Sequence, residues 1–164
     1  MNDWTGAEME VARRGLERAS AEILGRMLFE FSRLDVALGL CLIWSGDGRQ
    51  VEKLTKTVGE YSFHQKLEFL KELADGKFAR DAEARSLYSR WLRDAHKTRE
   101  MRNELIHGRW GTDPIKQQVV NVVGLPTSVD QREIRYTISD LERALLAMNE
   151  LHLRLQTLRK QWTV

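Results

Sequence analysis

The residues of this chain best suited to chemistry form the hexapeptide RNELIH at positions 102–107, at the end of a long amphipathic segment that predicts a helix. Asn103 and His107 are four residues apart, so they lie about 40° apart around a helix axis, on one face. Arg102 and His107 are five residues apart, about 140° around the axis, and do not stack on each other in a straight helix. Loosening of the helix at Gly108 would reduce the angle between Arg102 and His107. A second copy of the helix, crossing the first in a dimer, would close the gap, so the spacing favours a site assembled from two chains.

An arginine, a histidine and a polar amide together suit the cleavage of a phosphodiester. The guanidinium group donates paired hydrogen bonds to phosphate oxygens and stabilises charge that develops there. An imidazole takes or gives a proton near neutral pH. RNA brings its own nucleophile, the ribose 2′-hydroxyl. Arg102 and His107, with Asn103 as the orienting group, would therefore suffice for RNA cleavage without a metal or any other cofactor.

The charge around the hexapeptide is mildly basic. Between positions 90 and 109 there are six Lys and Arg against three acids. This excess would help the motif attract an RNA backbone, and it is also ordinary for a solvated helix face. We take Arg99 and Arg109 as candidate phosphate-binding residues. Lys66, from an earlier segment, either reaches phosphate or faces solvent.

Each residue of the proposed site also has a structural interpretation. A histidine and an arginine near a helix C-terminus are favoured by the helix dipole, whatever their function. Asn103 can bond to a neighbouring loop carbonyl. On this second interpretation the segment belongs to a non-catalytic binding or assembly module, in which Arg102 supports stability or dimerisation.

Other chemistries have little support in the sequence. Gly46-Asp47-Gly48 lacks the strand and the Lys-Ser/Thr pair of a phosphate-binding loop. We find no pair of Cys or His at zinc spacing and expect no metal. His64 is expected beside an apolar stripe in a structural role, whereas His96 and His152 are expected to be exposed.

Size and composition indicate one globular domain over residues 1–164, with 26 basic residues against 24 acidic ones and a net charge of +2. The single cysteine, Cys41, is expected to be a small buried hydrophobe. The first residues are too charged for a signal peptide, and the longest apolar run, Val36–Trp44, is too short for a membrane helix. We therefore expect a cytoplasmic protein without membrane contact.

Apolar residues at three- and four-residue spacing predict most of the chain to be helical. Thr5 and Glu8 have the spacing of a capping box, which opens an N-terminal helical extension over residues 1–20 with a bend at Gly15. The main predicted helices run over Ala21–Trp44, from an N-cap at Ser62 to a break at 74–77, and over Asp81–His107. A short helix is expected within 49–60, and Gly108 is expected to end the third helix in the left-handed conformation.

After Gly108 the spacing of the apolar residues is no longer that of a helix. Residues 115–123 and 132–138 are rich in β-branched side chains, and the seven residues 124–130 between them are turn-like, so a β-hairpin is predicted over 115–138. A last helix over 140–162 follows, capped by Thr137 or Ser139. The predicted fold is an all-α helical bundle with one small β-hairpin before the C-terminal helix.

The hexapeptide resembles the Arg-x4-6-His motif of HEPN domains, in which a polar residue often follows the arginine, as Asn103 does here. Ser62–Leu70 and the His107–Trp110 ending look like corresponding blocks of small bacterial members, and the resemblance covers about 21–158. It implies a single HEPN-like domain that dimerises so that two motifs face each other. Active members are metal-independent endoribonucleases, often in toxin–antitoxin or phage-defence systems with an antitoxin protein as partner. Other members are non-catalytic and bind nucleotides, RNA or proteins.

Overall fold

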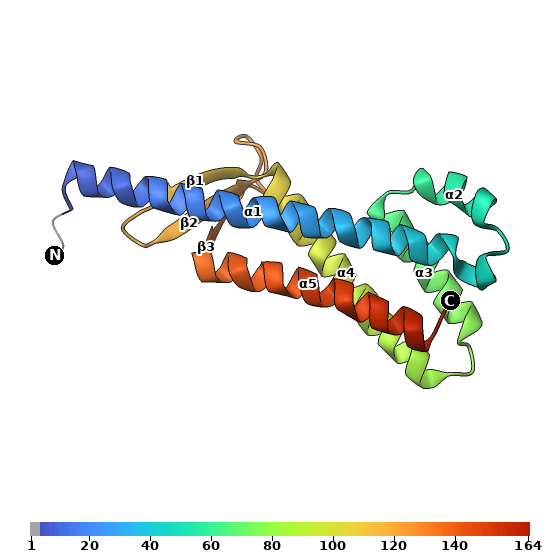
Figure 1. Ribbon diagram of the computed structural model, residues 1–164. Coiled ribbons are helices and arrows are strands. Elements are labelled where there is room, and N and C mark those ends of the chain that lie inside the picture. The colour runs from blue at the N-terminus through green and yellow to red at the C-terminus, as the bar shows by residue number, and fades with distance from the viewer. Residues whose placement is uncertain (1–3) are drawn as a thin grey trace. The chain divides into compact units, whose positions relative to one another are not determined.

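The computed structural model describes residues 4–164, so the first three residues of the predicted N-terminal extension lie outside the described part (Figure 1). The chain is mostly helical and contains one small antiparallel sheet. It forms two compact units. We call them the sheet unit, built from residues up to Phe29 and from 102–147, and the bundle unit, built from 30–101 and 148–164.

Helix α1 (Gly6–Ile43) contributes residues to both units. Its N-terminus has the predicted capping box, because the Glu8 carboxylate accepts hydrogen bonds from the Thr5 amide (2.8 Å) and hydroxyl (2.7 Å). Gly15, where a bend is expected, does not interrupt the helix, since α1 is helical throughout. A helix interior tolerates one glycine at a cost of about 1 kcal/mol when neighbouring residues hold the helix. After α1, the 3-10 turn η1 (Ser45–Gly48) reverses the chain.

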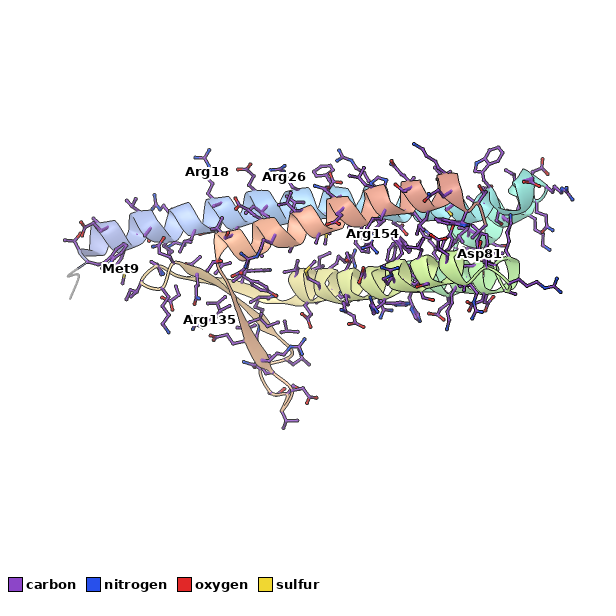
Figure 2. The ribbon with its side chains drawn as sticks, turned by 90° about the horizontal axis from the view of Figure 1, so that it is seen from below. Met9, Arg18, Arg26, Asp81, Arg135 and Arg154 are labelled. Atoms are coloured by element: carbon purple, nitrogen blue, oxygen red, sulfur yellow. The ribbon has the colours of Figure 1, made fainter. Side chains whose placement is uncertain are left out.

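The bundle unit contains α2 (Val51–Gly59), α3 (Phe63–Lys77) and most of α4 (Ala82–His107), close to the predicted bounds. Ser62 caps α3 as predicted, in a reciprocal capping box with Gln65. At the start of α4 the Asp81 carboxylate accepts a hydrogen bond from the amide of Ala84 (2.9 Å; Figure 2). These caps fix where α3 and α4 begin.

The core of the bundle unit is one apolar cluster drawn from α1, α2, α3, α4 and α5. Trp91 is fully buried, as expected, and its indole Nε1 donates to the carbonyl of Leu151 (2.9 Å). Cys41 is also buried here, as expected, and burial raises the pKa of its thiol to about 11. At the rim, Arg154 on α5 donates to the Asp94 carboxylate (2.8 Å; Figure 2). The largest fully buried side chains of this core are Trp91, Tyr88, Leu34, Leu38, Leu42, Leu67, Leu70 and Leu155.

The sheet unit corrects the expected hairpin to a three-stranded antiparallel sheet in the order β1-β2-β3. Strands β2 (Gln118–Val123) and β3 (Arg132–Tyr136) are the predicted pair, and β1 (Arg109–Asp113) is an added edge strand. Residues 115–117, expected to open the hairpin, form the turn between β1 and β2. The sequence of β1 has no apolar alternation, so its pairing with β2 is decided by the fold and not by a local pattern.

Helix α5 (Ile138–Gln161) follows the sheet, close to the predicted bounds. Thr137, one of the two expected caps, accepts a hydrogen bond from the Asp140 amide (3.1 Å) through its hydroxyl. The predicted inner stripe of α5 is buried throughout: Leu141, Leu145, Met148, Leu151, Leu155 and Leu158. Among residues 4–164, none of the helices combines the length and the apolar character that crossing a membrane requires.

Candidate functional site at the C-terminal end of helix α4

The three residues predicted to carry catalysis lie on the last turns of α4, within the sheet unit. His107 is the final helical residue and is exposed, Asn103 is exposed, and Arg102 is half-buried. Because α4 stays helical to His107, Arg102 and His107 remain about 140° apart around its axis. The loosening that would narrow this gap within one chain is not observed.

Arg102 and Asn103 contact each other directly. A terminal nitrogen of the Arg102 guanidinium, Nη1, donates a hydrogen bond to Oδ1 of Asn103 (3.1 Å). An arginine offers five N–H donors, and this bond uses one of them. Asn103 thus contacts Arg102, one of the two groups that it is predicted to orient.

The end of α4 is anchored to the sheet by two side chains that sequence reasoning missed. Asn121, on the central strand β2 and 0 % exposed, donates through Nδ2 to the carbonyl of Glu104 (2.9 Å). Trp110 on β1 donates through its indole Nε1 to the carbonyl of Leu105 (2.9 Å). The last carbonyls of a helix have no partner within the helix, so these donors satisfy them and fix its end. His107 projects from this anchored end.

Gly108 corrects a second expectation. The positive-φ residues of the chain do not include it, so it is not a left-handed helix terminator. Its amide continues the helical pattern by donating to the carbonyl of Glu104 (3.0 Å). Glycine is needed because a Cβ here would lie 1.6 Å from Oδ1 of Asn121. Asn121 Oδ1 is buried without a hydrogen bond among the described residues, and it lies against the backbone of Gly108.

A further ion pair joins the helix end to the sheet. The Glu104 carboxylate, between Asn103 and Leu105 in sequence, accepts from the guanidinium of Arg132 on β3. Within the sheet, Arg135 on β3 donates to Asp113 on β1 (2.8 Å; Figure 2). The only acid in the hexapeptide is thus neutralised by a sheet arginine, which favours the approach of an anion.

The predicted phosphate-binding residues belong to three different elements, β1, α4 and α3. Arg109 on β1 is exposed and donates weakly to the carbonyl of Gly124 (3.3 Å). Arg99 belongs to the bundle unit, where its Nη2 lies 3.5 Å from Oε1 of Glu100. Lys66, also in the bundle unit, does not face solvent: its side chain is 12 % exposed and its Nζ lies 2.8 Å from Oδ1 of Asp35. That ion pair gives Lys66 a structural role whether or not it contacts phosphate.

No family model, curated protein or solved structure matches this chain. The resemblance to HEPN domains therefore rests on residues 102–107, on the blocks at 62–70 and 107–110, and on the order of the elements around them.

One hollow of the sheet unit has a volume of about 370 Å³ and is lined by α1 and β1, including Arg13, Glu17 and Trp110. None of the six predicted site residues lines it.

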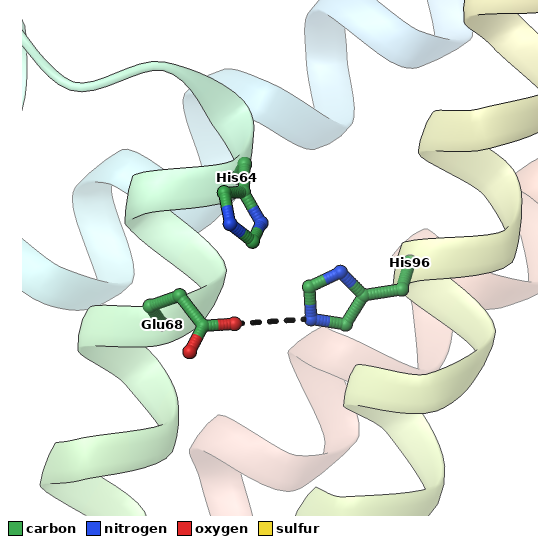
Figure 3. A group of neighbouring side chains, drawn as sticks. All are labelled: His64, Glu68 and His96. Carbon is green, nitrogen blue, oxygen red and sulfur yellow. Dashed lines mark ion pairs between the residues drawn. The ribbon is translucent and has the colours of Figure 1, made fainter.

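A second group of chemically capable side chains, which sequence reasoning missed, lies in the bundle unit. His64 and Glu68 on α3 lie beside His96 on α4 (Figure 3). His64 is exposed and not beside the core as expected, whereas His96 is half-buried and not exposed. The four-residue spacing of His64 and Glu68 was the only feature of the sequence that indicated this group. The third residue, His96, belongs to another helix, and only the fold brings it near the other two.

Proposed function

We propose that this protein is a metal-independent endoribonuclease of the HEPN type that acts in the cytoplasm as a homodimer. Arg102 binds the scissile phosphate, His107 transfers the proton, and Asn103 orients Arg102. The observation that carries the proposal is the position of these residues: all three lie at one anchored helix end, with His107 exposed and the Arg102 guanidinium held by Asn103.

In the proposed reaction, the ribose 2′-oxygen forms a bond to phosphorus as the bond from phosphorus to the 5′-oxygen breaks. A His107 imidazole takes the proton of the 2′-hydroxyl, and the resulting imidazolium gives a proton to the leaving 5′-oxygen. The Arg102 guanidinium stabilises the negative charge that builds on the non-bridging oxygens. The products are a 2′,3′-cyclic phosphate and a 5′-hydroxyl, and no step needs a metal ion.

The angular separation of Arg102 and His107 is the reason for proposing a dimer. Two side chains about 140° apart around the axis of one helix do not readily contact the same phosphate. When two copies of the helix end face each other, the arginine of one protomer and the histidine of its partner can approach the same phosphate. A protein that is monomeric in light scattering and still fully active in RNA cleavage would contradict this arrangement.

The direct test is incubation of the purified protein with structured and unstructured RNA in the presence of EDTA. We expect cleavage that ends in cyclic phosphates and that falls by a factor of about 100 or more in Arg102→Ala and His107→Ala variants. Arg90→Ala, which removes an exposed arginine from the same helix, is the matched control and should cleave normally. Cleavage that survives both site substitutions, or that requires a divalent metal, refutes the mechanism.

A biological test follows from the toxin–antitoxin or phage-defence role that the resemblance implies. Expression of the parent in a bacterial host should slow growth, and His107→Ala should remove the effect. A protein that co-purifies with the chain and suppresses cleavage would be the proposed antitoxin. Toxicity equal in parent and variant counts against a nuclease toxin.

The alternative function is a non-catalytic HEPN-like dimer that binds nucleotide, RNA or a protein partner. The half-buried position of Arg102 and its bond to Asn103 favour this alternative, because a structural arginine would have the same contacts. It predicts that Arg102→Ala lowers the melting temperature or weakens dimerisation, while the parent cleaves no RNA.

A further inference from the structure

Two imidazoles and a carboxylate converge on one face of the bundle unit (Figure 3). One ligand atom from each of His64, Glu68 and His96 lies within 4.8 Å of the other two. The His96 Nε2 is 3.5 Å from the Glu68 Oε1, and the ring centroids of His64 and His96 are 5.5 Å apart. Three side chains from two helices therefore point at a common volume.

The helix backbones that carry these groups are held by the core. His64 and Glu68 are four residues apart on α3, so they lie about 40° apart around its axis. Next to them in sequence, Leu67 is buried in the same apolar cluster as Ala95, the neighbour of His96 on α4. The core thus fixes α3 against α4 at the level of the three side chains.

The donor set matches a particular class of ion. Imidazole nitrogen and carboxylate oxygen bind zinc and related first-row divalent ions, whereas calcium and magnesium prefer oxygen alone. Bonds of about 2.0–2.2 Å in a tetrahedral site place ligand atoms about 3.4 Å apart. The Glu68–His96 pair already has this spacing. His64 and Glu68 are exposed, so small side-chain rotations can bring in the third ligand.

The charged groups around His96 are of both signs. Arg99 is a nearby cation, and the carboxylates of Glu68 and Glu100 also act on the His96 ring. The two carboxylates offset the charge of Arg99, so a divalent cation does not meet a purely basic surface.

We propose that His64, Glu68 and His96 form a three-ligand site for one divalent transition-metal ion, with zinc the best match, and leave a coordination position for water. The bound ion would link α3 to α4 in the bundle unit. This site is separate from the α4 end proposed for RNA cleavage, which needs no metal.

The test is a zinc titration of the full chain after treatment with EDTA and removal of any affinity tag. Calorimetry should give one ion per chain, and added zinc should raise the melting temperature. Cobalt bound in place of zinc should give the visible absorption that is typical of a site with a low coordination number. His64→Ala and Glu68→Gln, both at exposed positions, should each weaken zinc binding by a factor of about 10 or more and remove the rise in melting temperature.

The chain holds four histidines, and the two outside the cluster supply matched controls. His107→Ala and His152→Ala should bind zinc as the parent does. No saturable binding, or binding that His64→Ala and Glu68→Gln leave unchanged, overturns the proposal. RNA cleavage in EDTA is a separate readout, so failure of the metal site and failure of the nuclease proposal are distinguished.

Discussion

Replacement of Gly108 by alanine tests how the end of α4 is held. A Cβ at this position would lie 1.6 Å from Oδ1 of Asn121, 2.4 Å from its Cγ and 2.6 Å from its Nδ2. Asn121 is fully buried, so its side chain has no solvent space into which it can swing. Either the helix end moves away from β2 or the bond from Asn121 to the Glu104 carbonyl breaks.

The expected loss of stability follows from these two effects. Forcing extra volume into a packed site costs about 1–3 kcal/mol. Breaking a buried amide–carbonyl bond and leaving the carbonyl unsatisfied costs about 1–3 kcal/mol more. Gly108→Ala should therefore lower the free energy of unfolding by about 2–6 kcal/mol. Urea unfolding, followed by tryptophan fluorescence and by circular dichroism, measures the change.

A double-mutant cycle separates side-chain overlap from backbone strain. In an Asn121→Ala background the overlap is gone, so Gly108→Ala should cost less than about 1 kcal/mol. Gly111→Ala on β1, where a Cβ meets nothing within 4 Å, is the control and should change stability by about 0.5 kcal/mol at most. An equal cost of Gly108→Ala with and without Asn121 would refute the reasoning, because it would place the cost in the backbone.

Three further predictions concern the bundle unit. Tyr88→Phe removes the donor to the carbonyl of Trp162 (2.6 Å) and should lower stability by about 1–2 kcal/mol in thermal unfolding; an unchanged midpoint would show that water replaces the bond. Ser62→Ala removes the cap of α3 and should cost about 1 kcal/mol, whereas Ser62→Asp should retain most of the stability. Burial holds the pKa of His96 below its ordinary value of about 6.5, so the unfolded chain binds the proton first as the pH falls. The free energy of unfolding should therefore decline as the pH falls below about 6.5. Urea midpoints measured with EDTA should decline less steeply with pH in His96→Gln than in the parent. An equally steep decline in the variant would show that other groups cause it.

Helical periodicity explains why most of the fold was predictable. Helices α3, α4 and α5 each bury a stripe at three- and four-residue spacing, and their N-terminal caps are encoded by Ser62, Asp81 and Thr137. Strand β1 had no such signal. Its residues Arg109–Asp113 contain a glycine and no apolar alternation, and they are extended because β2 pairs with them.

The candidate sites were predictable to different degrees. Arg102, Asn103 and His107 are close in sequence, so one predicted helix was enough to place them. Asn121 is 17 residues from the carbonyl that it binds, and a buried asparagine on a strand gives no local signal of that partner. The group containing His64 and His96 was missed for the same reason, because its members meet only after α3 and α4 pack together.

The burial of Cys41 makes site-selective labelling of this chain practical. Its thiol is 3 % exposed and its pKa is about 11, so near neutral pH roughly one molecule in several thousand carries the reactive thiolate. A maleimide or spin label would leave the parent unmodified. A cysteine introduced by Ile106→Cys, at an exposed position next to His107, would then be the sole reactive thiol. Distances between spin labels on two chains would report directly how closely their helix ends approach.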